Sequence, residues 1–431
     1  MPDDSRLISA EKVCKTYQTA ETPGRLVLDH VDFALRAGEI VAILGKSGSG
    51  KSTFLRVLAG LTPPTEGHVA YRGQTVEGPA PGIAMVFQTF ALFPWLTVLG
   101  NVELGLEALG VPAAERRRRA VEAIDLIGLD GFESAYPKEL SGGMRQRVGF
   151  ARALVVNPEV LLLDEPFSQL DVLTAETLRN DLHDLWMERR IPTKGIVMVS
   201  HNIGEAVEMA NRILIFSSDP GRISAELPVR LARPREVDTP PFRQVVDQVY
   251  TLLTTGPGRD RRGTKPEPIG IGYRLPEAAV QQISGLLERL MDEPYSGRAD
   301  LPHLADEENL DMDELFPLIE LLHLLGFANV SGGDIELTAL GRAYAEADME
   351  GRKRMFADSV LKHVPIAAHI RRVLDERPGH RAPAARFLRE LEDHLSEEEA
   401  QRVLDTVINW GRHAEIFAYD DDEEVLSLED Y

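Results

Sequence analysis

The chain has 431 residues, of which 43% are hydrophobic and 27% charged, and its formal net charge is −22. This length predicts two or three domains, and the apolar content indicates a soluble, globular protein. The single cysteine, Cys14, excludes an intrachain disulfide and is typical of a reducing compartment. The start of the chain is acidic, and no apolar run approaches the roughly 18 residues of a membrane helix. We therefore expect a cytoplasmic protein whose work at a membrane needs a partner.

The negative charge is concentrated in the last third of the chain. Residues 281–431 contain 34 acidic and 15 basic residues, a net charge of −19, whereas the rest carries 35 acidic and 32 basic residues and a net charge of −3. Between these parts, residues 256–266 replace apolar periodicity with Pro, Gly and charge. This pattern predicts a first domain at 1–255, a linker at 256–275 and an acidic domain at 276–431.

The first 255 residues alternate strand and helix signals, the pattern of an α/β core with parallel strands. The predicted strands are 26–35, 40–44, 83–87, 160–163 and 195–199. Predicted helices begin at Lys51, continue in segments to about residue 155, and cover 173–189. In such folds ligands bind at the carboxyl ends of the strands, which is where the polar motifs of this chain lie.

The first of these motifs is a phosphate-binding loop between a predicted strand and a predicted helix. Its glycines let backbone N–H groups wrap a phosphate, Lys51 reaches the outer phosphates, and the Ser52 hydroxyl can ligate Mg²⁺. The alternative is a glycine-rich turn that only caps a helix, and the strand-loop-helix context disfavours it. The nucleotide-binding residues of this motif are Gly45, Lys46, Ser47, Gly48, Ser49, Gly50, Lys51, Ser52 and Thr53.

A second motif ends the leucine-rich strand at 160–163. Asp164 is expected to hold magnesium beside the phosphate loop, and Glu165 to act as general base toward a water. A low-dielectric site is expected to raise the pKa of Glu165 toward the useful range. The alternative, an Asp-Glu-Pro sequence that merely ends a buried strand, is weakened by the lysine of the phosphate loop.

Three further residues are candidate site residues because of their order along the chain relative to the other motifs. His201 follows a strand and can donate a hydrogen bond to a terminal phosphate, although a strand-end histidine alone is more often structural. Gln88 ends another strand, where it can touch both magnesium and the attacking water. Tyr17 can stack on an adenine ring or pack at a sheet edge.

A second anion site is predicted at Ser141, Gly142 and Gly143, which open a predicted helix. Backbone N–H groups and the helix dipole attract phosphate there. Two phosphate-binding segments in one chain suggest an active site that is shared between two chains.

These motifs resemble those of the ATP-binding subunits of ABC transporters over about residues 5–235. Tyr17 is similar to the A-loop aromatic residue, residues 45–52 to Walker A, Gln88 to the Q-loop, and residues 141–143 to the signature. Asp164 and Glu165 resemble Walker B, residues 168–171 with Asp171 resemble the D-loop, and His201 resembles the switch histidine.

The resemblance implies a P-loop NTPase fold, an ABC ATPase cassette with a helical signature subdomain, that binds ATP and Mg²⁺. It also implies a head-to-tail dimer in which each ATP lies between Lys51 of one chain and the signature of the other. Closure of that dimer would drive separate permease subunits, supplied by an extracytoplasmic or periplasmic substrate-binding protein, at the cytoplasmic face of the cell membrane.

Within the family, residues 89–102 and 164–171 look most like the importer branch for nitrate, sulfonates and taurine, so we expect a small anion as the cargo. Phe93 and Trp95 lie just after the Q-loop, where a permease helix would dock. Core packing of the helical subdomain is an equally good interpretation of these side chains.

The acidic tail predicts a helix at 315–325 followed by a hairpin at 327–338, and again a helix at 403–410 followed by a hairpin at 415–428. It resembles the AAA-associated C-terminal domain, mainly α and winged-helix-like, and is expected to regulate or dimerise. A passive, stabilising appendage is an equally good interpretation. A nucleic-acid-associated ATPase is the alternative, but the net charge of −19 opposes phosphate binding, so no nucleic-acid partner is expected.

Overall fold

A computed structural model of the chain describes residues 6–17, 24–218, 220–237, 239–254, 270–276 and 278–428. The chain divides into two compact units, Met1–Val249 and Tyr250–Tyr431. Helix α7 (Pro240–Thr254), which the sequence did not predict, carries the chain across this division. The predicted linker at 256–275 lies mostly outside the described residues.

A six-stranded sheet forms the centre of the first unit. Its strands are parallel except for β10, which runs antiparallel to β9. Strands β7 and β8 are buried along their whole length, which explains their unbroken apolar sequences. In sheet order the strands are β10 (Arg222–Pro228), β9 (Arg212–Ser217), β3 (Glu39–Gly45), β8 (Gly195–Val199), β7 (Val160–Asp164) and β6 (Ile83–Val86).

A second, antiparallel sheet packs over helix α1 (Lys51–Leu58). The ring of Phe54 on α1 meets Phe33 of the second sheet edge-on at 5.7 Å and lies 5.5 Å from Phe216 of β9. Because α1 is held between both sheets, the phosphate loop at its start has a fixed position. The strands of the second sheet are β2 (Arg25–Arg36), β1 (Arg6–Tyr17), β4 (Glu66–Tyr71) and β5 (Gln74–Thr75).

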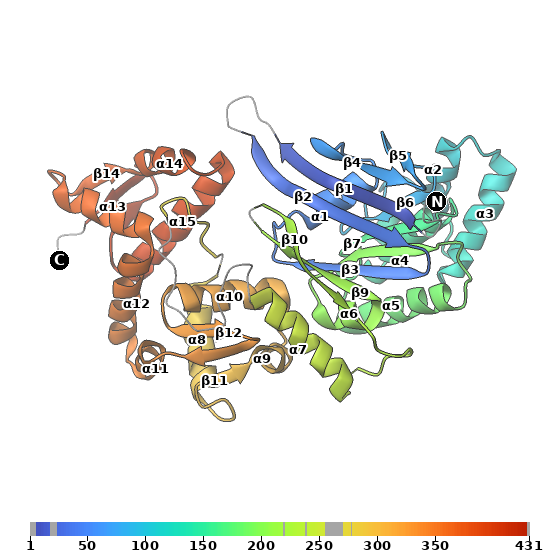
Figure 1. Ribbon diagram of the computed structural model, residues 1–431. Helices are drawn as coiled ribbons and strands as arrows, with labels where there is room; N and C mark the ends of the chain where they lie inside the picture. Colours follow the sequence, from blue (N-terminus) through green and yellow to red (C-terminus); the bar gives the residue numbers. More distant parts are fainter. Residues whose placement is uncertain are drawn as a thin grey trace. The chain divides into compact units, whose positions relative to one another are not determined.

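Helices supply the rest of the first unit and include the predicted helical subdomain. Helices α2 and α3 lie together at one end of this unit, with α4 packed against both (Figure 1). Their contact faces bury apolar side chains such as Val102, Ile124 and Val148. The helices are α2 (Val98–Ala108), α3 (Ala113–Leu126), the short 3₁₀ helix η1 (Pro137–Glu139), α4 (Gly142–Leu154), α5 (Val172–Met187) and α6 (Ile203–Met209).

The second unit contains the same arrangement twice. In the first repeat, three helices and a three-stranded sheet follow the order helix, strand, helix, helix, strand, strand, which is a winged helix. The repeat comprises α8 (Val280–Met291), β11 (Arg298–Asp300), α9 (Leu301–Glu308), α10 (Met312–Leu324), β12 (Ala328–Ser331) and β13 (Asp334–Leu337). The predicted helix and hairpin are confirmed.

The second repeat has the same order of helices and strands, and its own three-stranded sheet has the same strand order. Its first strand pairs through Ala382 with buried Leu426, as Ala299 of the first repeat pairs with buried Ile335. It comprises α13 (Pro365–Glu376), β14 (Arg381–Pro383), α14 (Ala384–Glu392), α15 (Glu397–His413), β15 (Ala418–Asp420) and β16 (Val425–Ser427), and α11 (Ala339–Glu346) and α12 (Met349–His363) separate the repeats. No helix in the described ranges is both long and apolar enough to span a bilayer.

Gly285 of α8 and Gly341 of α11 should respond to replacement by alanine in opposite directions. Gly285 lies exposed inside α8 with open space around it, so Gly285→Ala should stabilise the protein by about 0.5–1 kcal/mol. A Cβ at buried Gly341 would stand 2.0 Å from the carbonyl oxygen of Phe327, so Gly341→Ala should destabilise it by about 1–3 kcal/mol. Chemical denaturation measures the change in the free energy of unfolding for each variant. Changes of the same sign in both variants would contradict this account of packing.

Candidate functional site

The parallel strands bring the predicted motifs to one edge of the central sheet. Strand β3 ends at Gly45, where the phosphate loop begins, and Asp164 at the end of β7 pairs in register with Val199 of β8. Val199 precedes the turn that carries His201, and β6 ends two residues before Gln88. The expectation that the motifs cluster at strand ends is therefore met by the topology.

The phosphate loop is built from glycines in conformations that other residues rarely adopt. Gly48 and Gly50 have φ of 73° and 89°, and Gly50 begins α1 without any side-chain cap. The first N–H groups of α1 therefore have no capping side chain, and a phosphate can accept from them. The buried Lys51 ammonium donates to the carbonyl oxygens of Gly45 at 2.6 Å and Lys46 at 3.0 Å, which holds it within the loop.

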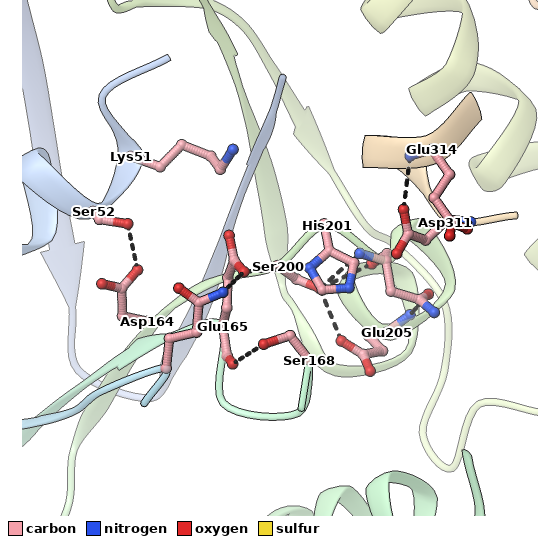
Figure 2. A network of polar contacts seen from close by, with 12 residues as sticks. Lys51, Ser52, Asp164, Glu165, Ser168, Ser200, His201, Glu205, Asp311 and Glu314 are labelled. Atoms are coloured by element: carbon pink, nitrogen blue, oxygen red, sulfur yellow. Dashed lines mark hydrogen bonds and ion pairs between the residues drawn. The ribbon is translucent and has the colours of Figure 1, made fainter. Parts of the chain in front are cut away.

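Two oxygen-bearing side chains meet beside this loop. The Ser52 hydroxyl donates to Oδ1 of Asp164 at 2.7 Å (Figure 2). Asp164 is 4% exposed, and burial is the main reason that its pKa is raised above the ordinary value. Hydroxyl and carboxylate oxygens are ligands that Mg²⁺ prefers, so these residues fit a magnesium ion.

The same burial leads to a prediction for nucleotide-free protein. An ionised carboxylate that is costly to bury opposes folding above the folded-state pKa, and this cost vanishes below the unfolded-state pKa. Asp164→Asn should therefore stabilise the apo protein at neutral pH by about 0.5–2 kcal/mol while weakening magnesium-dependent nucleotide binding. Thermal unfolding at several pH values tests this, and a gain that persists undiminished in acid would contradict the electrostatic cause.

Glu165 is held from two sides by the other strand-end residues. Its Oε2 accepts from Nε2 of Gln88 at 2.7 Å and lies 3.5 Å from Nδ1 of His201. The backbone of Glu165 has φ of 46°, a left-handed conformation that is strained for a non-glycine residue. Two side chains, those of Gln88 and His201, thus converge on one carboxylate oxygen of Glu165.

The expected direction of the Glu165 pKa shift is wrong, because the pKa is lowered and not raised. The hydrogen bond with His201 lowers the pKa and outweighs burial, which raises it. Burial does act as expected, but the sequence did not reveal that His201 lies within reach of this particular carboxylate.

A polar network behind His201, which sequence reasoning missed, positions the turn that bears it. Ser200 donates from Oγ to Oε2 of Glu205 at 2.8 Å, and Asn202 caps α6 by accepting from the Glu205 amide at 3.0 Å. Arg179 of α5 lies 3.4 Å from Glu205, whose pKa is raised by burial. These contacts join the helix after the D-loop to the helix after His201.

The signature opens α4 as predicted. The Ser141 hydroxyl accepts from the Met144 amide at 3.3 Å and so caps the helix. A Cβ on Gly143 would meet Cγ2 of Thr174 at 2.3 Å, whereas one on Gly142 would have ordinary contacts. Gln146, also missed from sequence, is buried and donates from Nε2 to the carbonyl of Pro166 at 2.6 Å, which ties α4 to the end of β7.

The remaining predicted residues are not among those that contact the Glu165 carboxylate. Tyr17 ends β1 with 43% of its surface exposed, and the ammonium of Lys15 stands 5.0 Å from its ring centroid. Asp171 caps α5 by accepting from the Thr174 amide at 3.0 Å, and Thr53 is half-buried on α1.

The exposure of Phe93 and Trp95, the aromatic pair after Gln88, tests whether these side chains pack in the core of the helical subdomain. Phe93 and Trp95 are 42% and 69% exposed, and their ring centroids are 5.4 Å apart. Asn101, fully buried, accepts from the Phe93 amide and donates to the Phe93 carbonyl, which fixes this segment. Core packing is therefore the wrong interpretation of Trp95.

A parallel sheet with a lysine-bearing phosphate loop, an Asp-Glu strand end and a strand-end histidine defines a P-loop nucleotide hydrolase. Residues 28–168 match the ABC transporter family, and residues 302–420 match the C-terminal AAA-associated domain. The chain belongs to the ABC transporter ATP-binding proteins and is an ATPase of that class.

Three relatives illustrate the match. A nitrate import ATP-binding protein of Synechocystis is 45% identical over 249 residues, which are 56% of this chain and 91% of the relative. A taurine import ATP-binding protein of Sinorhizobium fredii is 44% identical over 48% of this chain and 77% of its own length. An aliphatic sulfonates import ATP-binding protein of Bacillus licheniformis is 42% identical over 53% of this chain and 88% of its own length.

Proposed function

We propose that this chain energises import of a small anion of the nitrate, sulfonate, taurine or bicarbonate type through a separate permease. The observation that carries the proposal is the convergence of Gln88 and His201 on Glu165, beside Lys51 and the Ser52–Asp164 pair. The names of the relatives support the class of cargo, because nitrate, taurine and sulfonate importers all match this cassette.

The residues divide the work of ATP hydrolysis among them. Lys51 and the uncapped start of α1 bind the phosphates, and Ser52, Asp164 and Gln88 hold Mg²⁺. The ion, when bound, neutralises charge on the transferring phosphate. Glu165 accepts the proton of the attacking water, and His201, whose ring already contacts Glu165, orients that carboxylate and donates to the terminal phosphate.

A second copy of the chain completes each site. Ser141 caps its helix with its own side chain, and Gly142, which has no side chain, adds nothing that would cover the backbone N–H groups at the start of α4. We assign these groups, with Gly143 and Asp171, to the ATP bound by the opposite chain of a head-to-tail dimer. Tyr17 would stack on the adenine ring.

The surface bearing Phe93 and Trp95 is assigned to the permease. Its two exposed rings on a segment fixed by Asn101 offer the apolar anchor that an amphipathic helix needs. The chain would therefore work at the cytoplasmic face of the cell membrane, beneath a permease fed by an extracytoplasmic substrate-binding protein.

The acidic domain, placed at 276–431 after a linker at 256–275, is proposed to regulate or dimerise the cassette. Its tandem winged helices do not favour nucleic acid as the partner. The third helix of a winged helix enters DNA grooves, yet α10 and α15 begin with acidic first turns. The two runs of basic residues in this domain, 352–354 and 371–372, contain side chains that form ion pairs instead: Arg352 with Glu288, Lys353 with Glu415 and Arg371 with Asp375.

Uptake measurements in a strain that lacks the chain test the transport function. We expect uptake of one among labelled nitrate, taurine, an alkanesulfonate and bicarbonate to be lost, and to return with the wild-type chain but not with Glu165→Gln. Unchanged uptake of all four solutes would contradict the proposed cargo class. Restoration by Glu165→Gln would contradict the proposed energy coupling.

A further inference from the structure

A cluster of three different metal-binding side chains lies between strands β1 and β2. The thiol of Cys14 on β1 stands 3.6 Å from Nδ1 of His30 and 3.9 Å from Oδ1 of Asp29, both on β2. His30 Nδ1 and Asp29 Oδ1 are also hydrogen-bonded to each other. One donor atom from each residue therefore falls within 4.8 Å of the other two.

Irregular pairing of the two strands produces this convergence. The β1–β2 register shifts on both sides of Val13, next to Cys14, and such shifts re-aim side chains. His30 has φ of 47°, a strained conformation, and its amide donates to the Cys14 sulfur at 3.3 Å. The register shifts beside Cys14 and the left-handed backbone of His30 together bring the three side chains to one point.

The arrangement does not fit a cysteine nucleophile. In a Cys–His–Asp relay the thiol and the carboxylate contact opposite nitrogens of the ring, whereas here both face Nδ1. Cys14 is 4% exposed, too enclosed for a bulky electrophile. Three donors that converge on one point form a ligand set instead of a relay.

We propose that Cys14, Asp29 and His30 bind a divalent transition-metal ion of the zinc class. Thiolate, imidazole and carboxylate are the ligands that Zn²⁺ takes in proteins, at about 2.0–2.3 Å each, so neighbouring ligand atoms lie about 3.3–3.8 Å apart in a tetrahedron. The two distances from sulfur already approach this spacing, and the ion would replace the hydrogen bond between His30 and Asp29.

The surroundings suit an accessible ion. Asp29, with 11% of its side chain exposed, keeps its second oxygen for Arg222, whose Nε donates to Oδ2 at 2.7 Å. Such a partner orients a ligating carboxylate. A pocket of about 540 Å³, lined by Asp29, His30, Asp32, Arg222 and Ile223, borders the cluster and can admit the ion and a water as fourth ligand.

Cobalt titration of the full-length, reduced, metal-free and nucleotide-free chain tests the proposal. Because Cys14 is the only cysteine, a thiolate-to-cobalt charge-transfer band can come from no other residue. We expect the band to saturate at one Co²⁺ per chain and to disappear on addition of Zn²⁺. Its absence, or continued growth beyond one equivalent, would overturn the site.

Variants separate a built site from a lone reactive thiol. Cys14→Ser should abolish the band, and His30→Gln and Asp29→Asn should each weaken Co²⁺ binding by at least about tenfold. His30→Gln is the decisive variant, because the His30 side chain is 64% exposed and its replacement should leave the packing of the fold intact. His68→Gln, on the adjacent strand β4 and 51% exposed, is the matched control and should bind normally. If His30→Gln is folded by circular dichroism and its affinity for Co²⁺ is unchanged, His30 is not a ligand and the proposed site is wrong: Cys14 then binds the metal without it.

Discussion

Glu165→Gln should reduce ATP hydrolysis by about 100- to 10,000-fold while ATP binding is retained. Glutamine keeps the shape of the side chain and can still contact Gln88 and His201, which converge on Oε2 in the wild-type protein. It cannot accept a proton from water, so the chemical step fails and the ATP-bound dimer should accumulate. Single-turnover phosphate release and equilibrium ATP binding measure the two effects separately.

Two variants control this experiment. Glu176→Gln makes the same isosteric change at an exposed position of α5 and should hydrolyse ATP normally. His201→Gln removes the contact that most lowers the pKa of Glu165, so that pKa should rise and the acid limb of hydrolysis should move to higher pH. Normal hydrolysis by Glu165→Gln would assign the general base to another group.

The sequence was sufficient for the parts of the site that are local in the chain. The phosphate loop, the Asp164–Glu165 strand end and the signature helix each combine a motif with its own strand or helix, and parallel topology then brings strand ends together. The two helix–hairpin segments of the tail were likewise readable from apolar runs and turns. Their first strands were not, because β11 and β14 have three residues each, which is too few to establish a period in the sequence.

Contacts between distant segments could not be predicted in the same way. Arg179 of α5 meets Glu205 of α6 across 26 positions of the chain, and Gln146 of α4 reaches the Pro166 carbonyl across 20 positions. The lowered pKa of Glu165 depends on a 3.5 Å approach of His201 that no spacing in the chain specifies. The Cys14 cluster depends on register shifts that sequence periodicity conceals.

Lys51→Ala should weaken nucleotide binding itself, by about 10- to 100-fold, in contrast to Glu165→Gln. In the folded chain the Lys51 ammonium is buried and bound by the carbonyls of Gly45 and Lys46, so it is already positioned for a phosphate. Alanine keeps the N–H groups of the loop but removes this positioned charge, so binding should weaken without being abolished.

Nucleotide-induced stabilisation gives the measurement for Lys51→Ala. A ligand at about 100 times its dissociation constant stabilises the folded state by about 2.7 kcal/mol, so the melting temperature of the wild-type protein should rise with Mg-ATP. At the same concentration Lys51→Ala should show little or no rise. Arg56→Ala, on the exposed face of the same helix, should keep the wild-type shift. An undiminished shift in Lys51→Ala would mean that the backbone of the loop, and not the lysine, supplies the binding energy for the phosphates.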